Sequence, residues 1–84
     1  MSWGEIAIEV VGWTGALLIL LAYALVSARR VSPDGLPYQA LNIVGASGFV
    51  INGYVHGAMP SAVLNVIWIG IGVFVLARRR RAPA

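Results

Sequence analysis

The chain has 84 residues, of which 60% are hydrophobic and 11% are charged. Soluble domains carry about 25% charged residues, so this composition argues against an ordinary water-soluble protein. The formal net charge is +3, and the absence of cysteine excludes disulfides and thiolate metal sites.

Three apolar stretches follow one another along the chain, at residues 10–28, 38–55 and 61–77, and none contains Asp, Glu, Lys or Arg. Each is long enough to cross the ~30 Å hydrocarbon core of a bilayer as an α-helix. The sequence therefore predicts an all-α membrane protein with three transmembrane helices. We expect a single domain, residues 1–84, that ends in a short basic tail at 78–84.

The first stretch is preceded by Glu5 and Glu9 and followed by positive charge, the reverse of a secretory signal peptide. We therefore expect it to remain in the mature protein. The two glutamates either face solvent or contact a cation. Within the stretch, Gly12 and Ala16 form a pair of small residues four positions apart, which allows another helix to approach closely.

The six arginines form two groups that directly follow the first and the last apolar stretch. They are Arg29 and Arg30, and Arg78, Arg79, Arg80 and Arg81. Three crossings would place both groups on one side of the membrane, and the positive-inside rule assigns that side to the cytoplasm and the N-terminus to the outside. Such arginines suit contact with anionic lipid headgroups. No aromatic residues alternate with them, so we expect no nucleic-acid partner.

Both connections between the stretches are short. The first contains Ser32-Pro33-Asp34-Gly35, with proline and glycine at positions that favour a β-turn. Pro37 suits the first turn of the following helix, where its missing N–H leaves no hydrogen bond unmade. The second connection, residues 56–60, predicts that the second and third stretches are adjacent and antiparallel.

Amide side chains stand inside the second and third stretches, at Asn42, Asn52 and Asn65. An unpaired amide is costly in hydrocarbon, so these side chains must face protein or a wet cavity. Counting about 1.5 Å of helix rise per residue predicts that Asn52 and Asn65 lie level and face one another. Two interpretations stay open: hydrogen bonds that hold the helices together, or a pocket for a solute beside Trp68.

The remaining polar residues form no catalytic set. The sequence has no Ser–His–Asp arrangement, no paired carboxylates within a stretch and no glycine-rich phosphate loop, so we expect no enzymatic activity, no cofactor and no metal. His56 is a lone imidazole in the second connection, where it is either solvated or a site of pH gating.

Gly53, followed by Gly57-Ala58-Met59-Pro60-Ser61-Ala62-Val63-Leu64-Asn65-Val66, resembles the half-sized bacterial sugar transporters called SemiSWEETs, of the PQ-loop superfamily. The run is more similar still to a set of uncharacterised small bacterial inner-membrane proteins. The SemiSWEET resemblance implies that the third helix packs between the first two and that two protomers form a parallel dimer around a substrate path. It also implies that Asn65 is the pocket asparagine and that Phe49 replaces a pocket tryptophan.

The family's Pro-Gln pair falls near Leu25-Val26, and the first stretch of this chain contains no proline. The sequence therefore lacks the proline that acts as the hinge for alternating access in that family.

Three helices alone meet along a seam too narrow for a pocket of about 300 Å³, so we expect association into a homodimer. The function we expect is that of a half-transporter in the bacterial inner (cytoplasmic) membrane that moves a small polar solute. Its path would be lined on the outer side by Asn65, Asn52, Trp68 and Phe49 and on the inner side by Tyr23 and Asn42. No ionisable side chain lies inside a stretch, so transport would be uncoupled or weakly coupled. The alternative is a non-transporting accessory or lipid-interacting membrane subunit.

Overall fold

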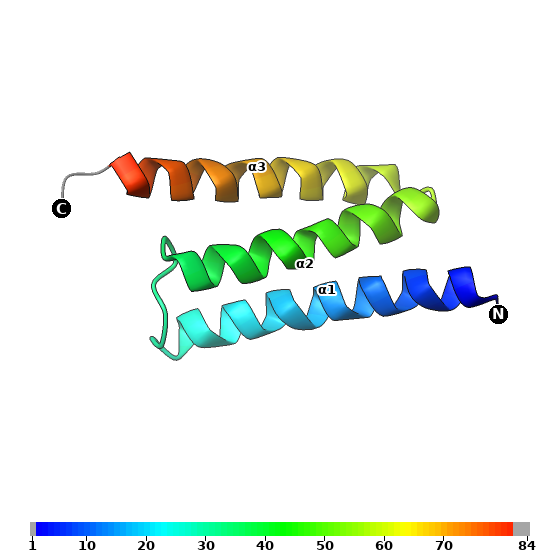
Figure 1. Cartoon of the computed structure of the whole chain (residues 1–84), viewed down its shortest axis with the longest axis horizontal. Coiled ribbons are helices and arrows are strands. Elements are labelled where there is room, and N and C mark those ends of the chain that lie inside the picture. Colours follow the sequence, from blue (N-terminus) through cyan, green and yellow to red (C-terminus); the bar gives the residue numbers. More distant parts are fainter. Residues whose placement is uncertain (1, 82–84) are drawn as a thin grey trace.

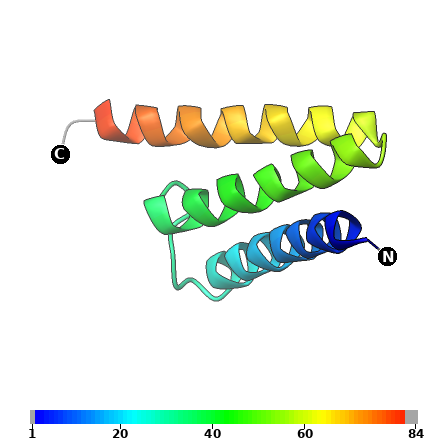
Figure 2. The ribbon, with the colours of Figure 1, turned by 45° about the vertical axis from the view of Figure 1, so that its right-hand side comes forward.

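The computed structural model describes residues 2–81, which form three α-helices. They are α1 (Trp3–Ser27), α2 (Leu36–Val55) and α3 (Met59–Arg81). α2 lies between α1 and α3 and runs antiparallel to both, an order that a second view also shows (Figures 1 and 2). Within the described residues α2 contacts both neighbours, whereas α1 and α3 do not contact each other. The result is a flat layer with extents of 51 × 24 × 18 Å.

Local capping explains where α1 begins and ends. Ser2 caps its first turn by accepting a hydrogen bond from the backbone N–H of Glu5 at 3.1 Å. At the other end Arg29 adopts a left-handed conformation with φ of 60°, and the N–H groups of Arg29 and Arg30 donate back to carbonyl oxygens of the last turn at 3.0 and 2.9 Å. This pattern satisfies carbonyl groups that the end of a helix leaves open.

The connection to α2 contains the predicted β-turn, since the N–H of Gly35 donates to the carbonyl oxygen of Ser32 at 3.0 Å. Pro37 lies in the first turn of α2, also as predicted. α2 ends at Val55, and Gly57, with φ of 72°, lies in the turn that leads into α3. The turn is tight, so α2 and α3 are adjacent, as the short second connection indicated (Figure 1).

The prediction of three transmembrane helices is wrong, although the helical class fits. Among the described residues two helices, α1 and α3, are long and apolar enough to cross a membrane. α2 has 20 residues but includes Gln39, Asn42, Ser47 and Asn52. It packs against a helix on each side and so carries small and polar residues where the outer helices carry large apolar ones. For predicting a transmembrane helix, the absence of charged residues in 38–55 was therefore a weaker criterion than a high content of apolar residues.

Two further expectations change with this correction. The N-terminus was assigned to the outside and the C-terminus to the cytoplasm on the assumption of three membrane crossings. Without three crossings, this assignment is no longer supported. The basic tail expected at 78–84 is helical in its first part, because α3 continues through Arg81. Residues 82–84 of that tail lie outside the described residues.

The helix interfaces are built from the smallest side chains. The buried apolar residues are alanines, at Ala22, Ala46 and Ala62. α1 and α2 cross at glycines, and a Cβ placed on Gly15 would lie 2.5 Å from the carbonyl oxygen of Gly45. Such an interface brings the two backbones into direct contact.

The large apolar side chains lie on the outside. Leu17 is 62% exposed and Phe74 is 63% exposed, and no large side chain among the described residues is fully buried. A soluble protein places its large apolar residues in its core. This chain shows the opposite distribution, with small residues at the interfaces and a continuous apolar exterior.

Candidate functional site

A groove runs between α1 and α3, and α2 forms its floor. It has a volume of about 460 Å³, so the expectation that three helices alone leave no room for a pocket of about 300 Å³ is wrong. We call it the central groove, and its lining residues are Ile19, Tyr23, Tyr38, Asn42, Leu64, Asn65 and Trp68. The groove exists because α1 and α3 stand apart on opposite sides of α2. It brings together four of the six residues predicted for the solute path, one from α1, one from α2 and two from α3.

Asn42 is the unusual residue of the central groove. Its side chain is only 4% exposed, and it makes no hydrogen bond with another described residue. No fully enclosed side-chain nitrogen or oxygen is left without a partner in residues 2–81. The Asn42 amide is therefore not fully enclosed. It lines the central groove and also a neighbouring cavity of about 280 Å³, and it offers one donor group and one acceptor to a bound molecule.

The remaining groups of the central groove are uncharged. Asn65 donates from Nδ2 to the carbonyl oxygen of Ser61 at 2.9 Å, which leaves its side-chain oxygen as an acceptor. Trp68 is 48% exposed, and Tyr23 is exposed as well. Amides, two phenols and an indole form hydrogen bonds with hydroxyl or amide groups, and the rings cover apolar faces of a ligand. The groove therefore suits a small, polar and uncharged solute.

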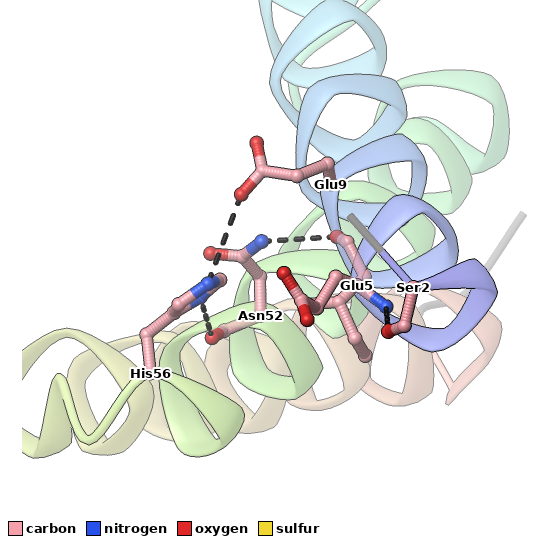
Figure 3. A network of polar contacts seen from close by, with 6 residues as sticks. Ser2, Glu5, Glu9, Asn52 and His56 are labelled. Atoms are coloured by element: carbon pink, nitrogen blue, oxygen red, sulfur yellow. Dashed lines mark hydrogen bonds and ion pairs between the residues drawn. The ribbon is translucent and has the colours of Figure 1, made fainter.

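The other two predicted path residues lie in a different cavity, of about 210 Å³. We call it the end pocket, and its lining residues are Glu9, Gly12, Trp13, Ala16, Phe49 and Asn52. The expected pairing of Asn52 with Asn65 is absent, because Nδ2 of Asn52 donates to the carbonyl oxygen of Ile8 on α1 at 3.0 Å (Figure 3).

The direction of Asn52 follows from its place on α2. It packs against Gly12 of α1, where an added Cβ would meet Nδ2 at 2.5 Å. The side of α2 that faces α3 carries other residues, among them Gln39 and Gly53. Asn52 lies level with the start of α3, as counting residues along the helices predicted. However, its side chain is on the face of α2 that packs against α1.

A contact between a histidine and a carboxylate adjoins the end pocket. Nε2 of His56 lies 3.7 Å from Oε1 of Glu9, and both side chains are about half exposed. Nδ1 of His56 lies 2.9 Å from the backbone oxygen of Asn52, so this nitrogen carries a proton and donates (Figure 3). From the sequence alone, no contact between Glu9 and His56 was predicted. The contact could have been predicted, because antiparallel neighbouring helices place the start of the first helix and the second connection at the same end of the molecule.

The sequence analysis also missed Tyr38 in the central groove and Trp13 in the end pocket as lining residues. Tyr38 lies one helical turn before Asn42, and Trp13 lies one turn after Glu9, so helical spacing alone indicates both. The two cavities follow the same faces of α1 and α2. Their residues recur at steps of three or four along α1, and on α2 they occupy positions 38, 42, 49 and 52. They form successive parts of one track along the layer.

The arginines lie at the opposite end from Glu9 and His56 (Figure 1). Arg29, Arg30, Arg78 and Arg79 are exposed. Asp34 shares this end, and its pKa is lowered by a hydrogen bond from the Ser32 hydroxyl, then by its own backbone N–H and by the charge of Arg79. The basic end therefore has one carboxylate within the described residues.

The helix order differs from the order that the SemiSWEET resemblance implies, because α2 rather than α3 lies in the middle. The comparisons give no curated protein and no solved structure that matches the chain. A protein-family model matches residues 8–83, which include all of α2 and α3 and most of α1. The chain therefore belongs to that family, a family of uncharacterised proteins.

Proposed function

We propose that this protein resides in the bacterial inner membrane and binds a small polar solute in the central groove, with two copies together forming a path for it. The observation that carries the proposal is the Asn42 amide, nearly buried and without a hydrogen-bond partner among the described residues, at the floor of a groove of about 460 Å³. A polar group held in this way retains its hydrogen-bonding capacity for a ligand.

The distribution of side chains supports the membrane location. α1 and α3 have the length and apolarity of membrane-crossing helices, and their large apolar side chains face outward. In lipid, such an apolar exterior does not carry the unfavourable free energy that its exposure to water would have. Small residues at the interfaces agree with this, because helices in lipid associate through close packing.

The open side of the central groove supports a second copy. Asn65 and Trp68 line the groove at its α3 wall, and a polar groove that opens toward acyl chains is unfavourable. A second copy that faces the first would close the groove and double its volume. The lining contains no charged residue, so the solute moves down its gradient in this proposal, without proton coupling.

Flux measurements test this proposal. The purified protein is reconstituted in liposomes with a panel of radiolabelled neutral solutes: glycerol, xylitol, xylose, glucose and urea. We expect accelerated entry of at least one solute, loss of most of that flux in Asn42→Leu, and partial loss in Tyr23→Phe. Tyr54→Phe is the matched control, because it removes the same hydroxyl from an exposed tyrosine outside the groove. Entry no faster than in empty liposomes for every solute, or full flux in Asn42→Leu, would remove the groove from this role.

An apolar surface favours a second candidate function, that of an accessory or lipid-interacting subunit. α2 and α3 border an open hollow of about 500 Å³, and its mostly apolar lining includes Ile51, Tyr54, Val63 and Ile67. Such a hollow suits an acyl chain or a helix of another protein. Purification in mild detergent separates the two candidates: a homodimer supports the half-transporter, and a fixed complex with a different membrane protein supports the subunit.

A further inference from the structure

We propose that the end pocket is a separate binding site for a small organic cation that carries an ammonium group. The pocket differs from the central groove in one respect that decides its chemistry, because a carboxylate lines it. The inference does not depend on transport through the groove.

The shape of the end pocket follows from alternating large and small residues. Gly12 and Ala16 lie on one face of α1 and line a hollow of about 210 Å³, and the Asn52 side chain of α2 packs against Gly12. Trp13 of α1 and Phe49 of α2 border this hollow. Aromatic rings around a cavity attract cations through the negative potential of their faces, and quaternary ammonium groups are bound in this way.

The charge of the end pocket comes from Glu9. It is the single charged residue in the lining, and its ion partner among the described residues is His56, at 3.7 Å. That partner compensates the carboxylate only when the imidazole is protonated. The arginines, which could neutralise Glu9 more strongly, lie at the other end of the layer (Figure 1).

Asn52 completes the site without competing for the cation. Its Nδ2 is engaged by the carbonyl oxygen of Ile8 at 3.0 Å, which fixes the side chain against Gly12 (Figure 3). The side-chain oxygen then remains as an acceptor beside the carboxylate. A carboxylate, an amide oxygen and two aromatic rings around one hollow are suited to an alkylammonium group, and an anion would meet unfavourable charge there.

Choline binding tests the site. The full chain, labelled with ¹⁵N and held in maltoside detergent without choline headgroups, is titrated with choline while the three indole N–H signals are followed by NMR. We expect a saturable shift of the Trp13 signal, assigned with Trp13→Phe, and little change for Trp3. The neutral analogue 3,3-dimethylbutan-1-ol has the same shape, and we expect it to bind about fivefold more weakly, because it loses both the partly exposed ion pair and the cation–π attraction.

Two charge variants make the test specific. Glu9→Gln should weaken choline binding about two- to fivefold. Glu5→Gln should leave it unchanged, because Glu5 lies on the same helix but does not line the pocket. Equal binding of choline and the neutral analogue by the unmodified chain overturns the proposal, and this comparison holds even if Glu9→Gln does not fold. Equal losses in both variants, or shifts of all three indole signals, also overturn it.

Discussion

Single polar residues in α2 fall into two groups. Gln39, Ser47 and Asn52 each donate a side-chain hydrogen bond to a backbone carbonyl oxygen, at 2.9, 2.7 and 3.0 Å. The Ser47 bond lies within α2 and the Gln39 bond reaches the preceding connection, whereas the Asn52 bond joins α2 to α1. Hydrogen bonds between helices in membrane proteins contribute about 0.6 kcal/mol each. Asn42 forms no such bond with the described residues. We therefore assign Asn42, at the floor of the groove, a role other than stability.

This distinction predicts opposite effects of one type of substitution. Asn52→Leu removes the bond that joins α2 to α1 and should lower the free energy of unfolding by about 0.5–2 kcal/mol. Asn42→Leu removes an amide that lacks a partner and should leave the free energy of unfolding unchanged or raise it. Unfolding by added sodium dodecyl sulfate, followed by circular dichroism, measures both. A larger loss for Asn42→Leu than for Asn52→Leu would contradict the assignment of roles.

Asp34 gives the basic end a defined response to acid. The hydrogen bond from Ser32 holds its pKa below the ordinary value in the folded chain. A carboxylate with a lowered folded pKa stabilises the fold above its unfolded pKa, and this contribution disappears as the pH falls through the folded value. The stability difference between the unmodified chain and Asp34→Asn should therefore be present at neutral pH and vanish in acid. Unfolding measured from pH 7 to pH 3 checks this; a difference that grows in acid would have the wrong sign.

At the scale of helices, glycine determines how α1 and α2 pack. An added Cβ on Gly15 would lie 2.5 Å from a backbone oxygen, and one on Gly48 would lie 2.7 Å from another. Backbone atoms cannot move aside as the end of a flexible side chain can. The pair must therefore separate along its length if either glycine gains a side chain.

Two alanine substitutions test the helix contact. Gly15→Ala should lower the free energy of unfolding by about 1–3 kcal/mol, because it overpacks a close contact. Gly70→Ala is the matched control: no atom of the described residues lies within 4 Å of an added Cβ there, so the intrinsic helix preference of alanine should stabilise α3 by about 1 kcal/mol. The same detergent titration measures both. Equal effects of the two substitutions would show that the close contact does not hold the helices together.

At the scale of the whole molecule, the layer places charge at its ends and apolar side chains along its length. The acidic residues Glu5 and Glu9 stand at one end, and four exposed arginines stand at the other. The exterior between them is apolar, with small residues sheltered at the interfaces. This arrangement is stable in lipid and unfavourable in water.

The chain should therefore behave as an integral membrane protein. We expect it to sediment with membranes of an expression host, to stay there after washing with alkaline carbonate or high salt, and to enter solution with mild detergent. A peripheral protein bound through its arginines would be released by salt, since electrostatic contacts are screened. Recovery in the soluble fraction without detergent would contradict the membrane location.

The sequence by itself determined the helices, the turn at Ser32-Pro33-Asp34-Gly35 and the position of Pro37, because apolar runs and turn residues act over a few neighbours. It also identified six of the residues that line the two cavities, but not Tyr38 or Trp13. It overestimated α2 as a transmembrane helix, since a stretch without charge need not be strongly apolar.

Only the tertiary structure decided which of these residues meet. Depth along a helix follows from residue counting, but the direction of a side chain depends on how each helix is rotated against its neighbours. That rotation is set by the glycine contact between α1 and α2, which turned Asn52 toward α1 and left Asn42 in the groove with Asn65 and Trp68. The middle position of α2 has the same origin, because packing on two sides suits the helix that carries small residues on both.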